Sequence, residues 1–172
     1  MNLSEFNQLT STQCQSLLVE VCHSFRWAKM MSQGRPFATL SVLQDTAKEI
    51  WAQMSKDDIL DAFSGHAKIG DLSALRDKYS AASAEQGQVA DAQEEVLHDL
   101  MRLNQEYEKK NGFIFIVCAT GKSAAQMRDM LLDRIDNSSE QELIAGAQEQ
   151  AKITEIRLNK LFTTAQTTEL AS

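Results

Sequence analysis

Apolar residues along this chain recur mostly at intervals of three and four, the spacing that places them on one face of an α-helix. After Ser11, a typical helix N-cap, the positions Leu18, Val21 and Cys22 follow this spacing and predict a helix to about Ser24. Similar patterns elsewhere bring the total to about eight predicted helices. They are a short helix capped by Ser4, helices over 11–24, 41–54, 55–64, 83–110, 123–135 and 139–162, and a short helix that Leu72, Leu75 and Tyr79 allow between 70 and 83.

Three stretches depart from the helical pattern. Residues 27–37 are rich in aromatics and methionine but contain Gly34 and Pro36, which indicates a packed turn. Residues 65–71 carry a histidine between two glycines, which is typical of a loop. Residues 113–119 have the best strand propensity in the chain, with no second strand to pair with. For 113–119 we therefore expect an extended or partly helical segment through the core, whose backbone lines a pocket and which follows Gly112 as a left-handed helix cap.

Composition narrows the class of protein. One proline in 172 residues favours an all-α fold, and the length fits a single domain over 1–172 with a polar tail from about 164. The net charge of −7 argues against nucleic-acid binding, and no apolar run approaches the roughly 20 residues that span a membrane. With no signal-peptide pattern at the N-terminus, we expect a cytoplasmic protein. Cys14, Cys22 and Cys118 lack metal-ligand spacing, and the first two are predicted to share a buried helix face.

The candidate chemistry is acid–base chemistry. His66 lies in the glycine-flanked loop, where a histidine can move protons near neutral pH, although taken alone it is better explained as a loop residue that makes a structural hydrogen bond or faces solvent. Glu85 and Gln86 supply a carboxylate and an amide near a predicted helix start. Arg157, among apolar neighbours in the last predicted helix, is suited to binding a carboxylate. Nothing in the spacing brings these groups together, and the pattern indicates only a helical protein acting on a small anion.

The motifs in combination resemble one family. Gly65-His66-Ala67-Lys68-Ile69-Gly70 is similar to the His-Pro-x-Ile-Gly signature of the OHCU (2-oxo-4-hydroxy-4-carboxy-5-ureidoimidazoline) decarboxylases of urate breakdown. Ser83-Ala84-Glu85-Gln86 resembles their Ser-x-x-Glu-Gln motif, and residues 104–119 resemble their Asn-x-x-Tyr-x-x-Lys-Phe-Gly-Phe-x-Phe-x-x-Cys segment. Arg35-Pro36-Phe37 and Ile156-Arg157-Leu158 match two further positions, so the resemblance covers nearly the whole chain in order.

The resemblance implies an all-helical homodimer that converts OHCU to (S)-allantoin and CO2 without a cofactor or a metal. It implies His66 and Glu85 as the catalytic pair. The implied substrate-binding residues are Ala67, Ala82, Ser83, Gln86, Ile116, Val117, Cys118, Ala119, Thr120 and Arg157.

Three positions depart from the family pattern. Ala67 replaces the proline after the histidine, the expected serine falls at Ala82 with Ser83 offset by one, and Asn111 stands where phenylalanine is usual. Two other readings stay open: a helical binding module without activity, and a related hydrolase or tautomerase that uses the same acid–base pair.

Overall fold

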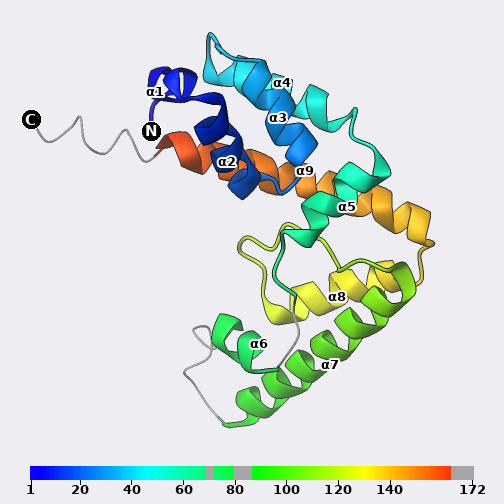
Figure 1. The fold of residues 1–172 in the computed structure, drawn as a ribbon. Helices are drawn as coiled ribbons and strands as arrows, with labels where there is room; N and C mark the ends of the chain where they lie inside the picture. The colour runs from blue at the N-terminus through cyan, green and yellow to red at the C-terminus, as the bar shows by residue number, and fades with distance from the viewer. Residues whose placement is uncertain (69–71, 80–86, 164–172) are drawn as a thin grey trace, which may run out of the picture. The chain divides into compact units, whose positions relative to one another are not determined.

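The computed structural model describes residues 1–68, 72–79 and 87–163, and within these ranges it contains nine α-helices and no strand (Figure 1). The all-α prediction is therefore confirmed. The helices are α1 (Leu3–Gln8), α2 (Ser11–Val21), α3 (Phe25–Gln33), α4 (Leu40–Trp51), α5 (Lys56–Ser64), α6 (Leu72–Tyr79), α7 (Gly87–Asn111), α8 (Ala124–Ile135) and α9 (Ser139–Thr163).

The chain divides into two compact units. The first unit comprises Met1–Gly65 and Ala147–Ser172, and the second comprises His66–Gly146. Helix α9 begins in the second unit and ends in the first. A single domain over the whole chain stays a prediction, and the predicted polar tail from about 164 lies outside the described residues.

Three helices begin one or two residues earlier than predicted. The N-caps are Asn2, Thr10 and Thr39, not Ser4, Ser11 and Ser41. At Thr10 the reason is a reciprocal capping box, in which the Thr10 side chain accepts from the backbone N–H of Gln13 and the Gln13 side chain accepts from the Thr10 backbone. Neighbouring Ser and Thr are equally good caps by composition, so the residue three positions later decides between them. The predicted caps at 55 and 123 are confirmed.

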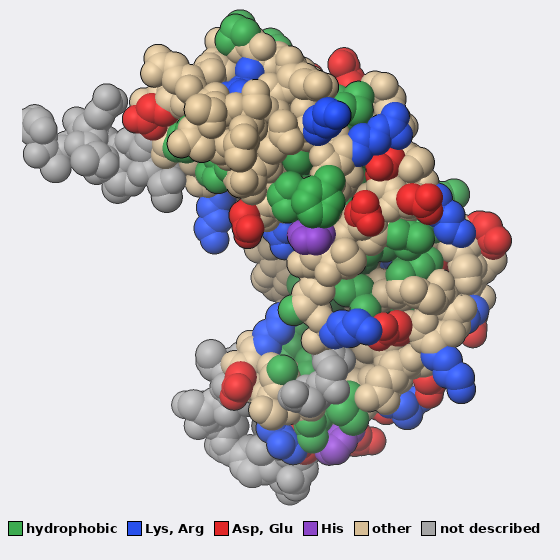
Figure 2. Space-filling view, viewed as in Figure 1, with side chains coloured by type: hydrophobic (Ala, Val, Ile, Leu, Met, Phe, Trp, Pro, Cys, Tyr) green, Lys and Arg blue, Asp and Glu red, His purple; other side chains and the backbone are tan. Residues whose placement is uncertain are grey.

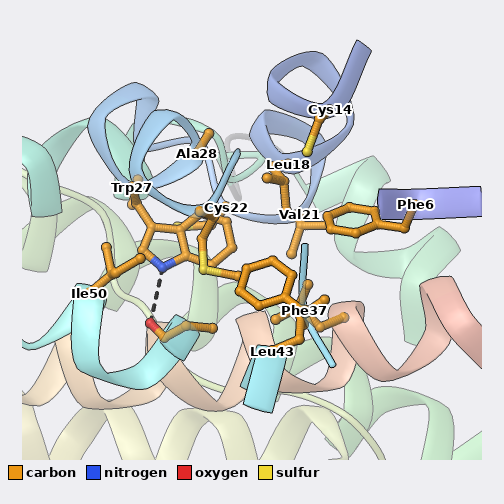
Figure 3. Close-up of a cluster of buried hydrophobic side chains, with 14 of the residues drawn as sticks. Phe6, Cys14, Leu18, Val21, Cys22, Trp27, Ala28, Phe37, Leu43 and Ile50 are labelled. Atoms are coloured by element: carbon orange, nitrogen blue, oxygen red, sulfur yellow. Dashed lines mark hydrogen bonds between the residues drawn. The ribbon is translucent and has the colours of Figure 1, made fainter. Parts of the chain in front are cut away.

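Helix α3 was missed. The helix predicted over 11–24 ends at Val21, and Ser24 instead caps α3 by accepting from the backbone N–H of Trp27. Trp27 and Met31 are buried one turn apart along α3, so the aromatics and methionines that suggested packing lie on the inner face of a helix. The core of the first unit forms around them, and the indole N–H of Trp27 donates to the carbonyl oxygen of Ala47 at 3.1 Å (Figure 3).

Arg35 joins two helix ends in the first unit. Its Nη1 donates to the carbonyl oxygens of Phe6 at 3.0 Å and Leu9 at 2.7 Å, and its Nε donates to that of Ser32 at 3.1 Å. These carbonyls lie at or near the C-terminal ends of α1 and α3, where a positive side chain meets the negative end of the helix dipole. Arg35 therefore has a structural role in this chain.

In the second unit, α6 and α8 pack against the long helix α7 (Figure 1). Between α7 and α8, residues 113–119 have no regular secondary structure, and Phe115, Ile116 and Val117 are buried. This confirms the predicted extended course, and Gly112, with φ of +76°, is the predicted left-handed residue after α7. Buried side chains of α6, α7, α8 and this segment form the second core: Leu75, Tyr79, Leu97, Leu100, Leu103, Tyr107, Phe115, Val117, Ala124, Met127 and Leu131.

Candidate functional site

His66 follows directly on the C-terminal end of α5. That helix begins at a capping box between Ser55 and Asp58, and its last turn is closed by the N–H of Gly65, which donates to the carbonyl of Ala62 at 3.3 Å. His66 lies in a bend after this cap and is half-buried, and Ala67 is exposed. The helix end thus fixes where the histidine leaves α5.

Gly65 is required by a close approach and not by its backbone angle, because its φ of −76° is ordinary. A Cβ at this position would lie 2.3 Å from Cβ of His23, which is far inside van der Waals contact. Nδ1 of His23 lies 3.3 Å from the carbonyl oxygen of Asp61, and its ring meets that of Phe25 edge-on at 5.6 Å. His23 therefore has a structural role, packed against the end of α5.

Beyond His66 the loop is attached to α7. Nζ of Lys68 lies 2.5 Å from Oε1 of Glu108, and both side chains are substantially exposed. An exposed pair of this kind contributes little to stability, but it restrains the loop in the second unit.

The five residues predicted to present backbone to a substrate form the end of the extended segment. Ile116 and Val117 are buried, Cys118 and Ala119 are half-buried, and Thr120 is exposed in a turn. That turn is closed by the N–H of Lys122, which donates to the carbonyl of Ala119 at 3.1 Å, and it contains Gly121 with φ of +72°. Nη1 of Arg134 donates to the carbonyl oxygen of Ile116 at 3.0 Å.

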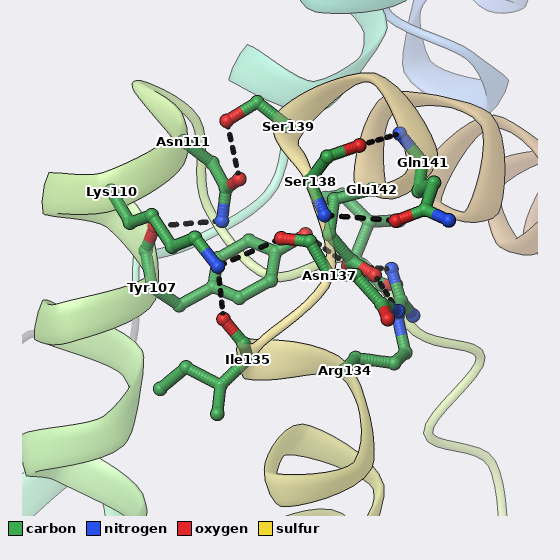
Figure 4. Close-up of polar contacts among 11 residues, drawn as sticks. Tyr107, Lys110, Asn111, Arg134, Ile135, Asn137, Ser138, Ser139, Gln141 and Glu142 are labelled. Atoms are coloured by element: carbon green, nitrogen blue, oxygen red, sulfur yellow. Dashed lines mark hydrogen bonds and ion pairs between the residues drawn. The ribbon is translucent and has the colours of Figure 1, made fainter.

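Arg134 belongs to a buried polar cluster that the sequence reasoning missed. Figure 4 shows Tyr107, Arg134 and Asn137 around Glu142, whose side chain is fully buried. One oxygen of Glu142 accepts from the Tyr107 hydroxyl at 2.5 Å and from Nε of Arg134 at 2.9 Å, and the other accepts from Nδ2 of Asn137 at 2.9 Å. The sequence carried no clear signal for Glu142, because the buried positions that follow it at intervals of four in α9, Gly146, Gln150 and Thr154, form no apolar stripe.

The electrostatics of the cluster favour an ionised Glu142. Burial by itself raises the pKa of this carboxyl, but the hydrogen bonds from Arg134, Tyr107 and Asn137 outweigh burial and lower it. The pKa of Tyr107 is raised, first by burial and then by the neighbouring Glu142 carboxylate, so the phenol stays protonated as a donor. The cluster is therefore a carboxylate with its counter-charge and its hydrogen bonds in place.

Asn111, one of the departures from the family pattern, is joined to this region. Its Nδ2 donates to the Tyr107 carbonyl at 3.0 Å and its Oδ1 accepts from the Ser139 hydroxyl at 2.9 Å. The neighbouring Lys110 donates to the carbonyls of Ile135 at 2.6 Å and Asn137 at 2.7 Å. The end of α7 thus holds the connection between α8 and α9 through side-chain hydrogen bonds.

Arg157 lies in the part of α9 that belongs to the first unit and is half-buried. Its Nη1 donates to the carbonyl oxygen of Val21, the last residue of α2, at 3.0 Å. The negative end of the α2 dipole thus partly compensates the positive charge of this arginine among apolar residues. This bond uses one of the five N–H donors of the guanidinium.

The structure does not test the predicted catalytic pair of His66 and Glu85, because Glu85 lies outside the described residues. The predicted substrate-binding residues Ala82, Ser83 and Gln86 lie outside them as well. Of the other predicted residues, His66, Ala67 and 116–120 belong to the second unit and Arg157 to the first. Two small grooves in the first unit, beside α4 and α9, are lined by other residues, among them Gln44 and Leu158.

Three further observations concern metal ions, membranes and surface charge. In the part of the chain that the structure describes, no three His, Cys, Asp or Glu side chains gather so as to hold a metal ion. Likewise, none of the described helices is both long and apolar enough to cross a membrane. Basic and acidic side chains are interspersed over the face that Figure 2 shows.

Known proteins similar to this chain agree on one family. A curated relative from Arabidopsis thaliana, "Uric acid degradation bifunctional protein TTL", is 38% identical over 146 residues, which is 82% of this chain and 45% of the relative. The chain thus spans less than half of that protein. A 2-oxo-4-hydroxy-4-carboxy-5-ureidoimidazoline decarboxylase of Haloferax volcanii is 24% identical over 165 residues, 94% of this chain and 96% of the relative.

A solved structure gives the same result in three dimensions. The crystal structure of an OHCU decarboxylase in the presence of (S)-allantoin matches with a TM-score of 0.70 and 37% identity, covering 84% of this chain and 96% of that one. The family model described as OHCU decarboxylase matches residues 7–159, a range that runs through both compact units. This chain therefore belongs to the OHCU decarboxylase family.

Proposed function

We propose that this chain decarboxylates OHCU to (S)-allantoin and CO2. The observation that carries the proposal is the family match over residues 7–159. The 37% identical structure solved in the presence of (S)-allantoin supports it. The motifs around His66, Glu85 and Arg157 stand in the family's order along the sequence.

The proposed reaction requires the protein to orient the substrate and to hold a proton donor beside the ring. The bond between the ring carbon and its carboxylate breaks, CO2 leaves, and the electron pair passes into the ureidoimidazoline ring, which delocalises it. The hydroxyl on that carbon then loses its proton and becomes the ring carbonyl, and the adjacent ring carbon, which carries the ureido group, takes up a proton on one face and so gains the (S) configuration. Because the ring itself accommodates the charge, the protein supplies geometry and an acid, and the proposal includes no cofactor.

Each predicted residue has a role in this proposal. His66 is the acid or base at the reacting carbon, and Glu85 orients it or exchanges a proton with the substrate hydroxyl. Gln86 and the backbone of 116–120 hold the ring and the ureido group, since an amide offers both donors and an acceptor. Arg157 binds the carboxylate or a ring carbonyl with the donors that its bond to Val21 leaves over.

The test is the chirality of the product. Freshly generated OHCU decays spontaneously to racemic allantoin, so circular dichroism during the reaction separates catalysis from decay. We expect the wild-type chain to speed the appearance of the (S) signal and the variants His66→Asn and Glu85→Ala to lose it. His98→Asn is the matched control, because His98 is a histidine of α7 with a 56% exposed side chain.

Two results would contradict the proposal. If the wild-type chain gives racemate at the spontaneous rate, the chain is no decarboxylase, and a binding module becomes the better interpretation. If His66→Asn and Glu85→Ala both turn over OHCU as fast as wild type, the site assignment fails while the activity stands.

The state of the protein in the cell is part of the same proposal. We expect a homodimer in the cytoplasm, as the family resemblance implies. Light scattering on the eluting protein measures the mass directly, and a value near the 19.2 kDa of one chain at micromolar concentration would contradict the dimer.

A further inference from the structure

The segment 113–119 is neither helix nor strand. Buried backbone groups in such a segment need partners from elsewhere in the fold. At Ile116, which is buried, the guanidinium of Arg134 is that partner, with Nη1 3.0 Å from the carbonyl oxygen. The direction of one peptide in the predicted substrate-binding stretch therefore depends on a side chain of α8.

Arg134 is itself held firmly. Its side chain is only 15% exposed, its Nε donates to Oε2 of Glu142 at 2.9 Å, and its Nη2 lies 2.7 Å from the same oxygen as an ion-pair contact outside hydrogen-bonding geometry. The guanidinium carbon lies 4.6 Å from the centroid of the Phe115 ring, within the range of a cation–π contact. Arg134 thus touches two adjacent residues of the segment, 115 and 116.

Tyr107 and Glu142 complete the support from two more helices. The Tyr107 hydroxyl donates to Glu142, while the Tyr107 ring meets Phe113 at 6.1 Å and Phe115 at 5.2 Å, both edge-on. Side chains of α7 and α8 therefore contact three positions of one segment, and Glu142 of α9 binds both of these side chains. All of these residues belong to the second unit.

Because the peptide bond is planar, the hydrogen bond to the Ile116 carbonyl also fixes the direction of the next backbone N–H group. The carbonyl of Ile116 and the N–H of Val117 share one trans peptide plane and point in opposite directions. Holding the carbonyl on Arg134 therefore aims the N–H of Val117 away from the guanidinium. We propose that Arg134, fixed by Glu142, is a positioning residue that orients the 116–120 backbone for substrate, an inference that rests on the proposed function.

The test compares variants that remove the guanidinium without leaving an unpaired buried charge. Arg134→Met combined with Glu142→Gln removes both charges and keeps an amide oxygen as acceptor for Tyr107. Glu142→Gln alone is the reference, because it has the same residue at 142, keeps the guanidinium that donates to Ile116, and offers that guanidinium an amide oxygen in place of the carboxylate. Arg128→Met, the same substitution on the same helix at an ion pair between neighbouring residues, is the control for the substitution itself.

The first measurement is amide hydrogen exchange of the ligand-free protein, which needs no activity. In the double variant we expect exchange across 117–120 to rise roughly tenfold relative to Glu142→Gln, the factor for one charge-assisted hydrogen bond, with the middle of α7 and α8 unchanged. Equal exchange in the segment overturns the proposal. So does an equal acceleration in α7 and α8, which makes Arg134 a residue of general stability only.

The second measurement is steady-state turnover of OHCU. A positioning role predicts that KM rises roughly tenfold in the double variant against Glu142→Gln, and that binding of (S)-allantoin weakens by a similar factor. A structural role alone lowers the folded fraction and leaves KM unchanged, which overturns the proposal. If wild type itself has no activity, the proposed function fails, and the exchange measurement still decides whether Arg134 orients the segment.

Discussion

Cβ of His23 occupies the space next to Cα of Gly65, at 2.3 Å from where a Cβ on residue 65 would stand. The contact joins the residue after the C-cap of α2 to the residue before the predicted catalytic histidine. A side chain at 65 therefore has to displace backbone and not merely rotate a flexible group.

Gly65→Ala is expected to destabilise the protein by about 1–3 kcal/mol, the usual cost of overpacking. Urea unfolding measures the change in the free energy of unfolding. Turnover of OHCU should fall as well, because the backbone next to His66 has to shift. Gly34→Ala is the control: Gly34 has an ordinary backbone conformation as the C-cap of α3, and a Cβ there meets the Phe37 ring at 3.4 Å. The double variant His23→Gly/Gly65→Ala should recover part of the loss, and no recovery would place the strain elsewhere.

Two buried tyrosines of the second unit should respond oppositely to loss of the hydroxyl. Tyr107→Phe removes a hydrogen bond to the buried Glu142 carboxylate and should cost about 1.5–3 kcal/mol. Tyr79→Phe should be neutral or stabilising, because the Tyr79 hydroxyl is buried and has no hydrogen-bond partner among the described residues. Thermal unfolding of both variants checks this, and equal losses would mean that the Glu142 bond contributes nothing specific.

Stability should fall in acid through Glu142. Its pKa is lowered in the folded chain from an ordinary value of 4.5, so the folded state binds fewer protons than the unfolded state around and below that pH. The resulting stabilisation is complete above the unfolded pKa and is lost as pH falls through the lower folded pKa. Glu142→Gln does not titrate, so its stability should depend less steeply on pH below 4.5 in urea unfolding series. An unchanged slope would contradict this.

The three thiols should react at different rates. Burial raises the pKa of Cys14 and Cys22, both of which are fully buried, whereas Cys118 is half-buried. A thiol reagent should therefore modify the native chain at Cys118 first and reach the other two only on unfolding. Cys118→Ala should abolish the early phase, and a persistent early phase would place the reactive thiol on α2 or at its end. Saturating (S)-allantoin should slow the reaction at Cys118 if 116–120 binds the ligand.

The sequence predicted well what depends on neighbouring residues. Helix positions followed from apolar spacing, and the left-handed Gly112 followed from the Asn-Gly pair after a long helix. It predicted less well what depends on a choice between equal local options, such as Thr10 against Ser11 as N-cap. Helix α3 was missed because Gly34 and Pro36 at its end suggested a turn through the whole stretch.

Contacts between distant residues were beyond the sequence pattern. Nothing near Gly65 indicates that His23, 42 positions earlier, lies where a side chain at 65 would stand. The apolar neighbours of Arg157 were explained by a bound anion, but the carbonyl of Val21 meets part of that need within the fold. The roles of His66 and Glu85 rest on the family resemblance and stay predictions.

The hydrogen bonds of Glu142 have a consequence for how long the second unit stays folded. Its donors come from α7, α8 and the connection after α8, and the bond from Tyr107 spans 35 positions of the chain. Such contacts close only after these helices have docked, so we expect them to be absent from the transition state for folding. Interactions formed that late slow unfolding without speeding folding. Arg134, which donates both to Glu142 and to the extended segment, should therefore also slow the unfolding of the second unit.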